Sequence, residues 1–159
     1  MKMNRSGTKI NRYGILFDSL LELDIYEEFK LRGIILQRGL PITVTEKFES
    51  GVKCFTNDNK TFAFKLESPK VREIVYTPDF ILPVNNHNVY IELKGFANET
   101  FRYRWKLFKR LLEEKEPNAL IFLVKRRHNG RVKPKDNEAR IIETKQIVDS
   151  IIKLSEYGK

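Results

Sequence analysis

The spacing of apolar positions changes along the chain, and each change predicts where an element begins or ends. Apolar residues at helical spacing predict a helix over about 19–32, with Gly33 at a position where helices commonly stop. A second helix is expected over about 99–116, and Pro117 follows its end. Its apolar positions at helical spacing are Phe101, Trp105, Phe108 and Leu112. These aromatic residues are expected in the core rather than as stacking platforms for bases.

Shorter runs of β-branched and aromatic residues lie between these helices. Residues 41–67 contain three such runs separated by turn signals, which predicts antiparallel strands at 42–45, 52–55 and 61–66. Two further runs, 74–82 and 88–94, flank a short polar segment and predict a hairpin.

The last third of the chain predicts a strand, a second short strand and a helix. The continuously apolar run 119–124 is typical of a strand buried on both faces. A short strand is expected at 139–142, followed by a helix to about 157 with Thr144 as its N-cap. The apolar residues of this helix include Ile147, Ile151 and Leu154. We expect the helix to cover the sheet, with a homodimer contact as the alternative.

These elements predict an α/β (α+β) fold with a mixed central sheet flanked by helices. The expected order is αβββαβ, with extra strands at 41–67 and a C-terminal helix. Residues 1–15 lack a clear apolar period and are interpreted as a basic flexible arm. Residues 16–159 are expected to form a single domain, because one core commonly holds about 100–200 residues.

The predicted hairpin carries the most informative charged residues. Period-2 alternation places Glu92 and Lys94 on one face of the strand 88–94. A symmetric loop centred on Asn85-Asn86 pairs positions whose numbers sum to 171, so Asp79 lies opposite Glu92 on that face. This pairing depends on the register, because a slip of one residue moves every side chain to the other face.

A third carboxylate comes from the first predicted helix. On a helical projection Glu22 falls inside the apolar arc, whereas the other acids of this helix fall outside it. An inward carboxylate is costly unless it is paired or binds a cation. Ser19 and Glu22 also match a capping box, in which Glu22 bonds only the backbone at the helix start. Both interpretations are open at this point.

Three acids and a lysine that converge in this way suit one kind of chemistry. Carboxylate oxygens are ligands for Mg²⁺ or Mn²⁺, and such an ion activates water against a phosphodiester. A lysine such as Lys94 adds positive charge beside the attacking water or the scissile phosphate. The acid-x-Lys pattern recurs elsewhere in the chain, but Pro78-Asp79 is the only Pro-Asp. An ordinary surface pair on a half-buried strand is the alternative.

The segments 17–22, 76–80 and 91–95 together resemble the PD-(D/E)XK nuclease superfamily. They are similar to small phage-type members, including endonuclease I-type Holliday-junction resolvases and the nuclease subunit of some transposition systems. The resemblance covers about residues 15–125 and implies a restriction-endonuclease-like core. It implies that Asp79, Glu92 and the Leu93 carbonyl hold the metal, that Glu22 completes the metal site and that Lys94 is catalytic. Ser19 matches a small polar residue often seen one turn before the glutamate.

The net charge of the chain predicts the chemical class of its binding partner. The chain has 30 Lys+Arg against 21 Asp+Glu, a net charge of +9, so we expect an anionic partner, with DNA as the first choice. Solubility alone is the alternative explanation of this charge. The longest apolar run, 119–124, is too short to span a membrane, and no secretory signal is visible. The single cysteine, Cys54, leaves no intrachain disulfide, so a cytoplasmic protein is expected. The resemblance implies that this is a bacterial or phage-infected host cytoplasm.

Two groups of basic residues are candidates for contacts with DNA. One is a stripe on the second helix, with a solvated helix flank as the equal alternative. The other is the loop that follows the strand 119–124, with a loop that only aids solubility as the alternative. The helix stripe consists of Arg102, Lys106 and Lys109. The group after the strand consists of Lys125, Arg126, Arg127 and Arg131.

The sequence thus predicts a Mg²⁺- or Mn²⁺-dependent endodeoxyribonuclease that acts on branched DNA, Holliday-junction or flap-like, in phage or mobile-element DNA processing. One alternative is a sequence- or end-directed nuclease subunit that works with partner proteins. A second is a non-catalytic DNA-binding module with the same fold.

Overall fold

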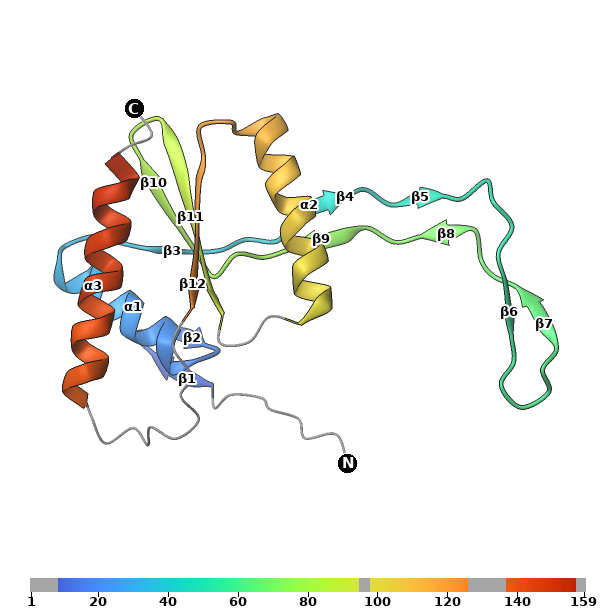
Figure 1. The fold of residues 1–159 in the computed structure, drawn as a ribbon, viewed down its shortest axis with the longest axis horizontal. Coiled ribbons are helices and arrows are strands. Elements are labelled where there is room, and N and C mark those ends of the chain that lie inside the picture. Colours follow the sequence, from blue (N-terminus) through green and yellow to red (C-terminus); the bar gives the residue numbers. More distant parts are fainter. Residues whose placement is uncertain (1–8, 95–97, 126–136, 157–159) are drawn as a thin grey trace. The chain divides into compact units, whose positions relative to one another are not determined.

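The computed structural model describes residues 9–94, 98–125 and 137–156. The chain divides into two compact units that alternate along the sequence. The sheet unit consists of Met1–Leu40, Pro78–Ala97 and Glu116–Lys159, and the hairpin unit of Pro41–Thr77 and Asn98–Lys115. The range predicted as a single domain therefore contains parts of both units. The elements are labelled in Figure 1.

The sheet unit contains the central sheet and two helices. Its elements in chain order are β1 (Ile10–Arg12), β2 (Ile15–Phe17), α1 (Leu20–Leu31), β3 (Gln37–Arg38), β10 (Phe80–Val84), β11 (His87–Lys94), β12 (Leu120–Lys125) and α3 (Asn137–Ser155).

The hairpin unit contains one helix and a series of short strands. Its elements are β4 (Ile42–Thr45), β5 (Phe48–Glu49), β6 (Phe55–Asn57), β7 (Phe64–Leu66), β8 (Lys70–Val71), β9 (Ile74–Tyr76) and α2 (Glu99–Lys115).

The central sheet has the strand order β12-β11-β10-β3 and is mixed, as the sequence predicts. β10 pairs antiparallel with β11 and with β3, whereas β12 runs parallel to β11. The β10–β11 pairs run from Phe80↔Ile91 to Val84↔His87, and their residue numbers sum to 171. The predicted register of this hairpin is therefore confirmed.

Two two-residue loops fix hairpins in the sheet unit. Asn85 begins the loop between β10 and β11 with a φ of 45°, a conformation that Asn adopts more readily than most residues. Tyr13 and Gly14 join β1 to β2, and both have positive φ, as a type I′ turn requires. The range predicted as a flexible arm, 1–15, therefore contains β1, this turn and the first residue of β2, and residues 1–8 of that range lie outside the described residues.

Helix α1 matches its prediction at both ends. Ser19 is its N-cap, with an extended backbone and a side chain that accepts from the Glu22 amide, and Gly33 follows the C-cap with a φ of 72°. Its buried residues include Ile25 and Phe29, which join the core formed with β10 and β11. The helix therefore covers the sheet with its apolar face.

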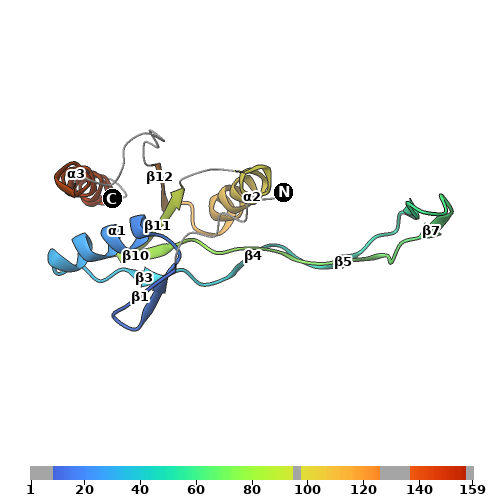
Figure 2. The same cartoon turned by 90° about the horizontal axis from the view of Figure 1, so that it is seen from below.

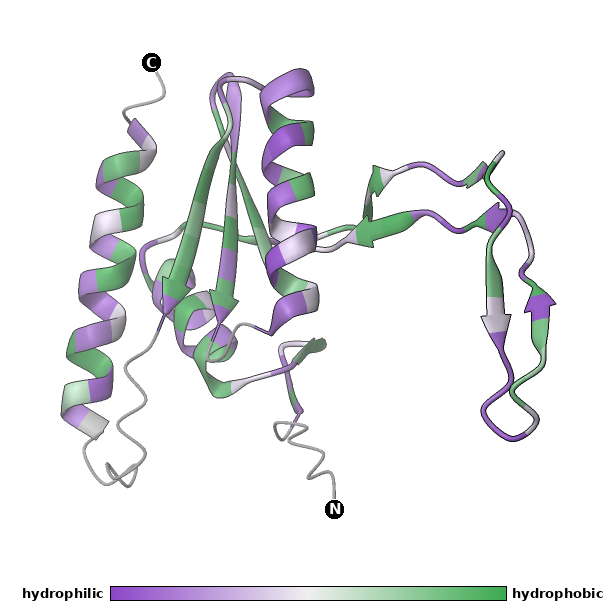
Figure 3. Ribbon diagram, turned by 45° about the vertical axis from the view of Figure 1, so that its right-hand side comes forward, coloured by the Kyte–Doolittle hydropathy of each residue, from purple (hydrophilic) through white to green (hydrophobic). Residues whose placement is uncertain are grey.

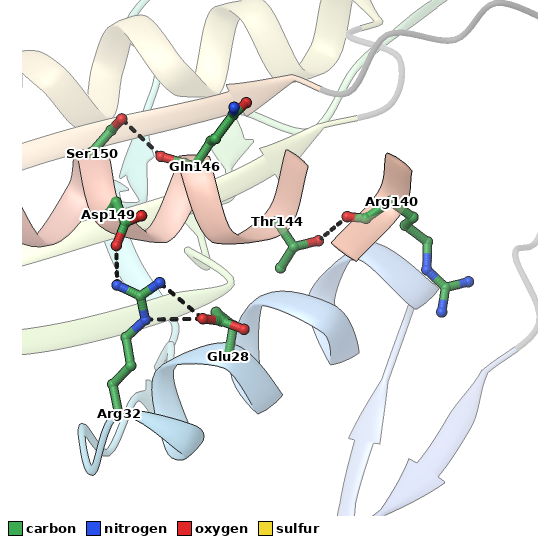
Figure 4. Close-up of polar contacts among 7 residues, drawn as sticks. All are labelled: Glu28, Arg32, Arg140, Thr144, Gln146, Asp149 and Ser150. Atoms are coloured by element: carbon green, nitrogen blue, oxygen red, sulfur yellow. Dashed lines mark hydrogen bonds and ion pairs between the residues drawn. The ribbon is translucent and has the colours of Figure 1, made fainter. Parts of the chain in front are cut away.

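The C-terminal segment differs from its prediction. Residues 137–155 form the single helix α3, so the strand expected at 139–142 is absent from this described range. Thr144 is not an N-cap, because its hydroxyl donates to the Arg140 carbonyl one turn earlier (2.8 Å) within the helix (Figure 4). The β-branched Ile141 and Ile142 favour a strand only weakly, and tertiary context overrides such a preference; in the helix, Arg140 forms an ion pair with Asp24 of α1 (3.2 Å).

Helix α3 packs on α1, and the two helices are also joined by polar contacts. Val148 and Ile151 are buried in the core cluster. Arg32 bonds Glu28 on its own helix and reaches Asp149 on α3 (Figure 4). The face that enters the core is thus centred on Val148 and Ile151, whereas Leu154 is exposed.

Strand β12 also differs from its prediction. It is an edge of the described sheet, and most of its residues are half-buried rather than buried on both faces. A continuous apolar run is therefore not evidence of a central position here. β11 lies inside the sheet between β12 and β10, and its residues from His87 to Leu93 are buried apart from the half-buried Asn88.

The predicted strand 74–82 is divided in two. β9 pairs with β4 in the hairpin unit, and β10 begins only at Phe80 in the sheet unit. Pro78 lies between them and has no N–H to donate to a ladder, which explains why the pairing partner changes there.

Residues 46–73 form a long antiparallel ribbon, called the β-arm below. The strand pairs β5–β8 and β6–β7 continue outward from β4–β9 (Figures 1 and 2). All of these residues are exposed except Ser50 and Asp58, which are half-buried. Hydrophobic residues nevertheless extend to its tip (Figure 3), and they include Phe55, Phe62 and Phe64. The strands expected at 52–55 and 61–66 are found shifted and shortened as β6 and β7.

At the base of the hairpin unit, α2 packs on β4 and β9 through aromatic residues. Tyr76 of β9 stacks on Phe108 with a centroid distance of 4.5 Å, and Trp105 lies between Phe101 and Phe108. The prediction that these helix residues are core is confirmed for Phe101, Phe108 and Leu112, which are buried, while Trp105 is half-buried. None of the helices in the described ranges is long and apolar enough to cross a membrane.

The β-arm should be removable without loss of the fold. Thr45 pairs with Ile74, so an Asn-Gly turn can close the chain after residues 46–73 are deleted. We expect the free energy of unfolding to stay within about 2 kcal/mol of the full chain, because the deleted residues are exposed and the loop is shorter. Urea unfolding followed by circular dichroism measures this. Loss of the cooperative transition, also with a Gly-Asn-Gly-Lys closure, would contradict it.

Candidate functional site

The hairpin β10–β11 holds the first carboxylate of the candidate site. Asp79 immediately precedes β10, and its Oδ2 accepts a hydrogen bond from the backbone N–H of Leu93 (2.6 Å). Continuing the confirmed register by one residue places Asp79 opposite Glu92. The side chain of Asp79 is therefore fixed against the backbone of the strand that carries Glu92 and Lys94.

Glu92 and Lys94 form an ion pair on β11. The Lys94 ammonium donates to Glu92 Oε1 at 3.0 Å, and the Glu92 side chain is only 4% exposed whereas that of Lys94 is 32% exposed. The buried carboxylate is thus compensated by a cation that still reaches solvent. This arrangement follows from period-2 alternation, which puts both residues on the same face.

Glu22 combines the two roles that the sequence leaves open. It is buried, and its Oε2 accepts from the Asp18 backbone N–H at 3.1 Å, as a residue of a capping arrangement does. The same oxygen accepts from Arg38 Nη1 at 2.9 Å. Glu22 is therefore both a cap partner at the start of α1 and an inward-facing, ion-paired carboxylate.

The three carboxylates act on one another electrostatically. The pKa of Asp79 is raised to about 7, first because the carboxyl is buried and next because of the charge on Glu92. The charge of Glu22 raises the pKa further, while the Leu93 N–H and Lys94 lower it. Asp79 is accordingly close to half protonated at neutral pH, and it releases its proton when positive charge is added beside it.

The donor set suits a hard divalent cation by its chemistry. Its side-chain donors are carboxylate oxygens, and their mutual repulsion is relieved by a cation among them. In the described geometry each carboxylate faces a different donor, namely Leu93 N–H, Lys94 or Arg38. Accordingly, the described residues contain no group of three or more His, Cys, Asp or Glu side chains arranged to hold a metal ion. Asp79, Glu92, Leu93 and Glu22 remain the predicted ligands.

Sequence reasoning missed Gly39, which borders the site. Its amide donates to the Asp79 carbonyl at 3.1 Å, and a Cβ built on it lies 1.7 Å from the Pro78 carbonyl oxygen. Glycine is therefore required here by close approach of two backbones. A glycine at the end of a strand is a weak signal of such an approach, and the partner segment is 39 residues away along the chain.

Arg38 was also missed. It precedes Gly39 on β3, pairs in register with Phe80 and bonds Glu22. Nothing in its local sequence marks it, because an arginine in a basic chain carries little information. Only the pairing of β3 with β10 brings it to the carboxylates.

The predicted DNA-contacting residues are distributed over both units. Ser19 is the N-cap of α1, and Lys125 is exposed at the end of β12. The stripe on α2 is exposed in the hairpin unit and consists of Arg102, Lys106 and Lys109. Arg126, Arg127 and Arg131 lie outside the described residues. The DNA contacts of all these residues stay predictions.

No match to this chain was found. The comparisons covered protein-family models, curated proteins and solved structures. The interpretation of the site therefore rests on its residues and their geometry.

The raised pKa of Asp79 gives stability a definite pH dependence. Between about pH 4 and 7 the folded chain keeps a proton that the unfolded chain has lost, so the free energy of unfolding falls as pH rises through this range. Asp79→Asn removes this contribution and should gain stability relative to the wild type at pH 8, by up to roughly 4 kcal/mol. Urea unfolding at pH 4.5, 6 and 8 measures the difference.

The control for this experiment is Asp58→Asn. Asp58 lies on the exposed β-arm, and hydrogen bonds from the Thr61 and Lys60 amides lower its pKa. This variant should show no gain between pH 4.5 and 8. If Asp79→Asn and the wild type keep a constant stability difference across this range, the environment assigned to Asp79 is wrong.

The close approach at Gly39 predicts a second effect. Gly39→Ala forces Pro78 and Asp79 away from β3, because a Cβ does not approach a backbone oxygen to 1.7 Å. We expect a loss of stability of about 1–3 kcal/mol. Gly51→Ala is the matched control, since a Cβ there meets nothing within 4 Å. Equal stability of the two variants would show that the backbones at Gly39 are not in contact.

Proposed function

We propose that this protein is a metal-dependent endonuclease that hydrolyses phosphodiester bonds in DNA. The observation that carries the proposal is a group of three carboxylates, the buried Glu22 and Glu92 and the half-buried Asp79, with Lys94 beside them. Burying like charges close together is costly, as the pKa of Asp79 at about 7 indicates. Proteins keep such arrangements where a cation or a reaction uses them.

The proposed core is restriction-endonuclease-like. When β1, β2 and the strands of the hairpin unit are set aside, the chain order α1, β3, β10, β11, α2, β12 matches the proposed order αβββαβ, and the C-terminal helix α3 follows it. In this order the proposed ligands come from three neighbouring places, the start of α1, the residue before β10 and the end of β11. This order supports the proposal and is independent of the charges.

The proposed ligands of Mg²⁺ or Mn²⁺ are the carboxylates of Asp79, Glu92 and Glu22 and the carbonyl of Leu93. A divalent cation in such a site supplies an activated water and neutralises charge on the phosphodiester. Asp79 gives up its proton on binding, and Glu92 exchanges its contact with Lys94 for a contact with the cation. Affinity for the metal therefore rises with pH up to about 7.

Lys94 has the proposed catalytic role. Its ammonium lies 3.0 Å from Glu92 and its side chain is partly exposed, so it can reach both the ligand group and a bound substrate. Once released from Glu92 it places positive charge beside the attacking water or the scissile phosphate, where negative charge develops.

The proposed substrate is branched DNA, such as a Holliday junction or a flap, in phage or mobile-element DNA processing. The net charge of +9 supports a polyanionic substrate. Contacts with phosphates are assigned to the exposed residues Lys125, Arg102, Lys106 and Lys109 and to Arg126, Arg127, Arg131 and Ser19. Action as a homodimer is part of the same proposal.

The test compares four-way junction, flap and linear duplex DNA in the presence of Mg²⁺, Mn²⁺ or EDTA. The wild type should cut with either metal and not with EDTA. Asp79→Ala, Glu92→Gln and Lys94→Ala should each slow cutting by on the order of 10²-fold or more. The rate is measured in single-turnover reactions with labelled strands.

The matched control is Lys60→Ala, which removes the lysine of another acid-x-Lys sequence, on the exposed β-arm. It should cut like the wild type. Metal-dependent cutting at the wild-type rate in Asp79→Ala would contradict the proposal. Salt-dependent DNA binding without cutting in any metal would instead identify a non-catalytic DNA-binding module.

A further inference from the structure

Arg38 occupies a special place beside the carboxylates. It lies on β3, opposite Phe80 in the register, and its Nη1 is 2.9 Å from Glu22 Oε2. The Glu22 side chain is 6% exposed, whereas that of Arg38 is 34% exposed. The guanidinium therefore reaches from a buried carboxylate towards solvent.

The position of this guanidinium is held from several sides. Its Cζ lies 5.1 Å from the ring centroid of Phe80 and 5.8 Å from that of Phe17, and both rings are fully buried. Contacts of this kind hold a guanidinium over aromatic rings. The next residue, Gly39, is hydrogen-bonded to the backbone of Asp79. The side chain and the backbone of β3 are thus both tied to the site.

The contacts of Arg38 leave it able to bind an anion. A guanidinium has five N–H donors in a planar fork. In Arg38, one nitrogen, Nη1, donates to Glu22. The fork matches two oxygens of a phosphate, a geometry that a lysine cannot reproduce. A phosphodiester brought to the carboxylates would meet this partly exposed donor group.

We propose that Arg38 is a phosphate-binding residue of the site and that its ion pair with Glu22 is exchanged when substrate and metal bind. In the free protein, Arg38 neutralises Glu22. When a divalent cation takes the Glu22 oxygen, the guanidinium is released and donates to non-bridging oxygens of the DNA phosphate. This inference rests on the proposed nuclease function and adds a residue to it.

The exchange has two consequences of opposite sign. In the absence of DNA, Arg38 competes with the cation for Glu22, so its removal should leave Mn²⁺ affinity unchanged or raise it several-fold. In the presence of DNA, its removal takes away a charge-assisted contact, so DNA affinity should fall about tenfold or more. A merely structural arginine would weaken metal binding and stability together.

The experiment uses the full chain with Arg38→Gln and Arg38→Lys. Mn²⁺ binding without DNA is measured by electron paramagnetic resonance, and junction DNA binding by anisotropy in Ca²⁺. Cutting is measured in Mg²⁺, and folding by thermal unfolding. Arg38→Gln should keep or improve Mn²⁺ affinity and lose DNA affinity and cutting. Arg38→Lys should recover only part of the DNA affinity, because it restores the charge without the fork.

The matched control is Arg140→Gln, which breaks an ion pair of similar exposure, the one with Asp24 of α1. It should leave Mn²⁺ affinity, DNA affinity and cutting at wild-type values. Wild-type DNA affinity and cutting in Arg38→Gln would overturn the inference, and so would a joint loss of Mn²⁺ affinity and thermal stability. Failure of the wild type itself to bind Mn²⁺ or to cut overturns the nuclease proposal instead, so the two failures are distinguishable.

Discussion

The register of β10 on β11 is the constraint on which the rest of the sheet unit depends. The loop at Asn85 and Asn86 sets it, and each pair from Phe80↔Ile91 to Val84↔His87 follows from it. β3 then pairs with β10, and β12 with β11. A slip of one residue would move the side chain of Glu92 to the opposite face and separate it from Asp79. The short loop therefore determines the chemistry as well as the fold.

The site stores electrostatic free energy within an otherwise ordinary core. Glu22 and Glu92 each have a cationic partner, whereas Asp79 has a backbone N–H and carries the raised pKa. The least compensated carboxylate is thus the one that immediately precedes β10. The burial of such a carboxylate lowers the stability of the free protein, and under the proposed function the same site gains affinity for a cation. The neighbouring core, with Phe80 and Ile91 fully buried, supplies the stability that tolerates it.

The sequence was most informative where the determining interactions are local. The ends of α1 and the β10–β11 register could be predicted, because a cap and a two-residue loop act over a few residues. Strand β12 was placed wrongly, since an apolar run does not reveal which strand lies beside it. The strand at 139–142 was wrong because contacts with α1 favour helix there. Arg38 and Gly39 were missed because only a distant strand gives them their role.

The hairpin unit also has a consequence for the order in which the chain assembles. Arg38 and Phe80 are 42 positions apart along the chain (80 − 38), so closing that loop is entropically costly. Pairing of Ile42 with Tyr76 leaves only four residue steps on each side to connect Arg38 to Phe80. This prior pairing of β4 with β9 reduces the entropic cost of bringing Arg38 to Phe80 by roughly 1.5 kcal/mol. The β4–β9 stem thus converts a long-range contact into a nearly local one, and folding of the inserted segment prepares the approach of Gly39 to Pro78.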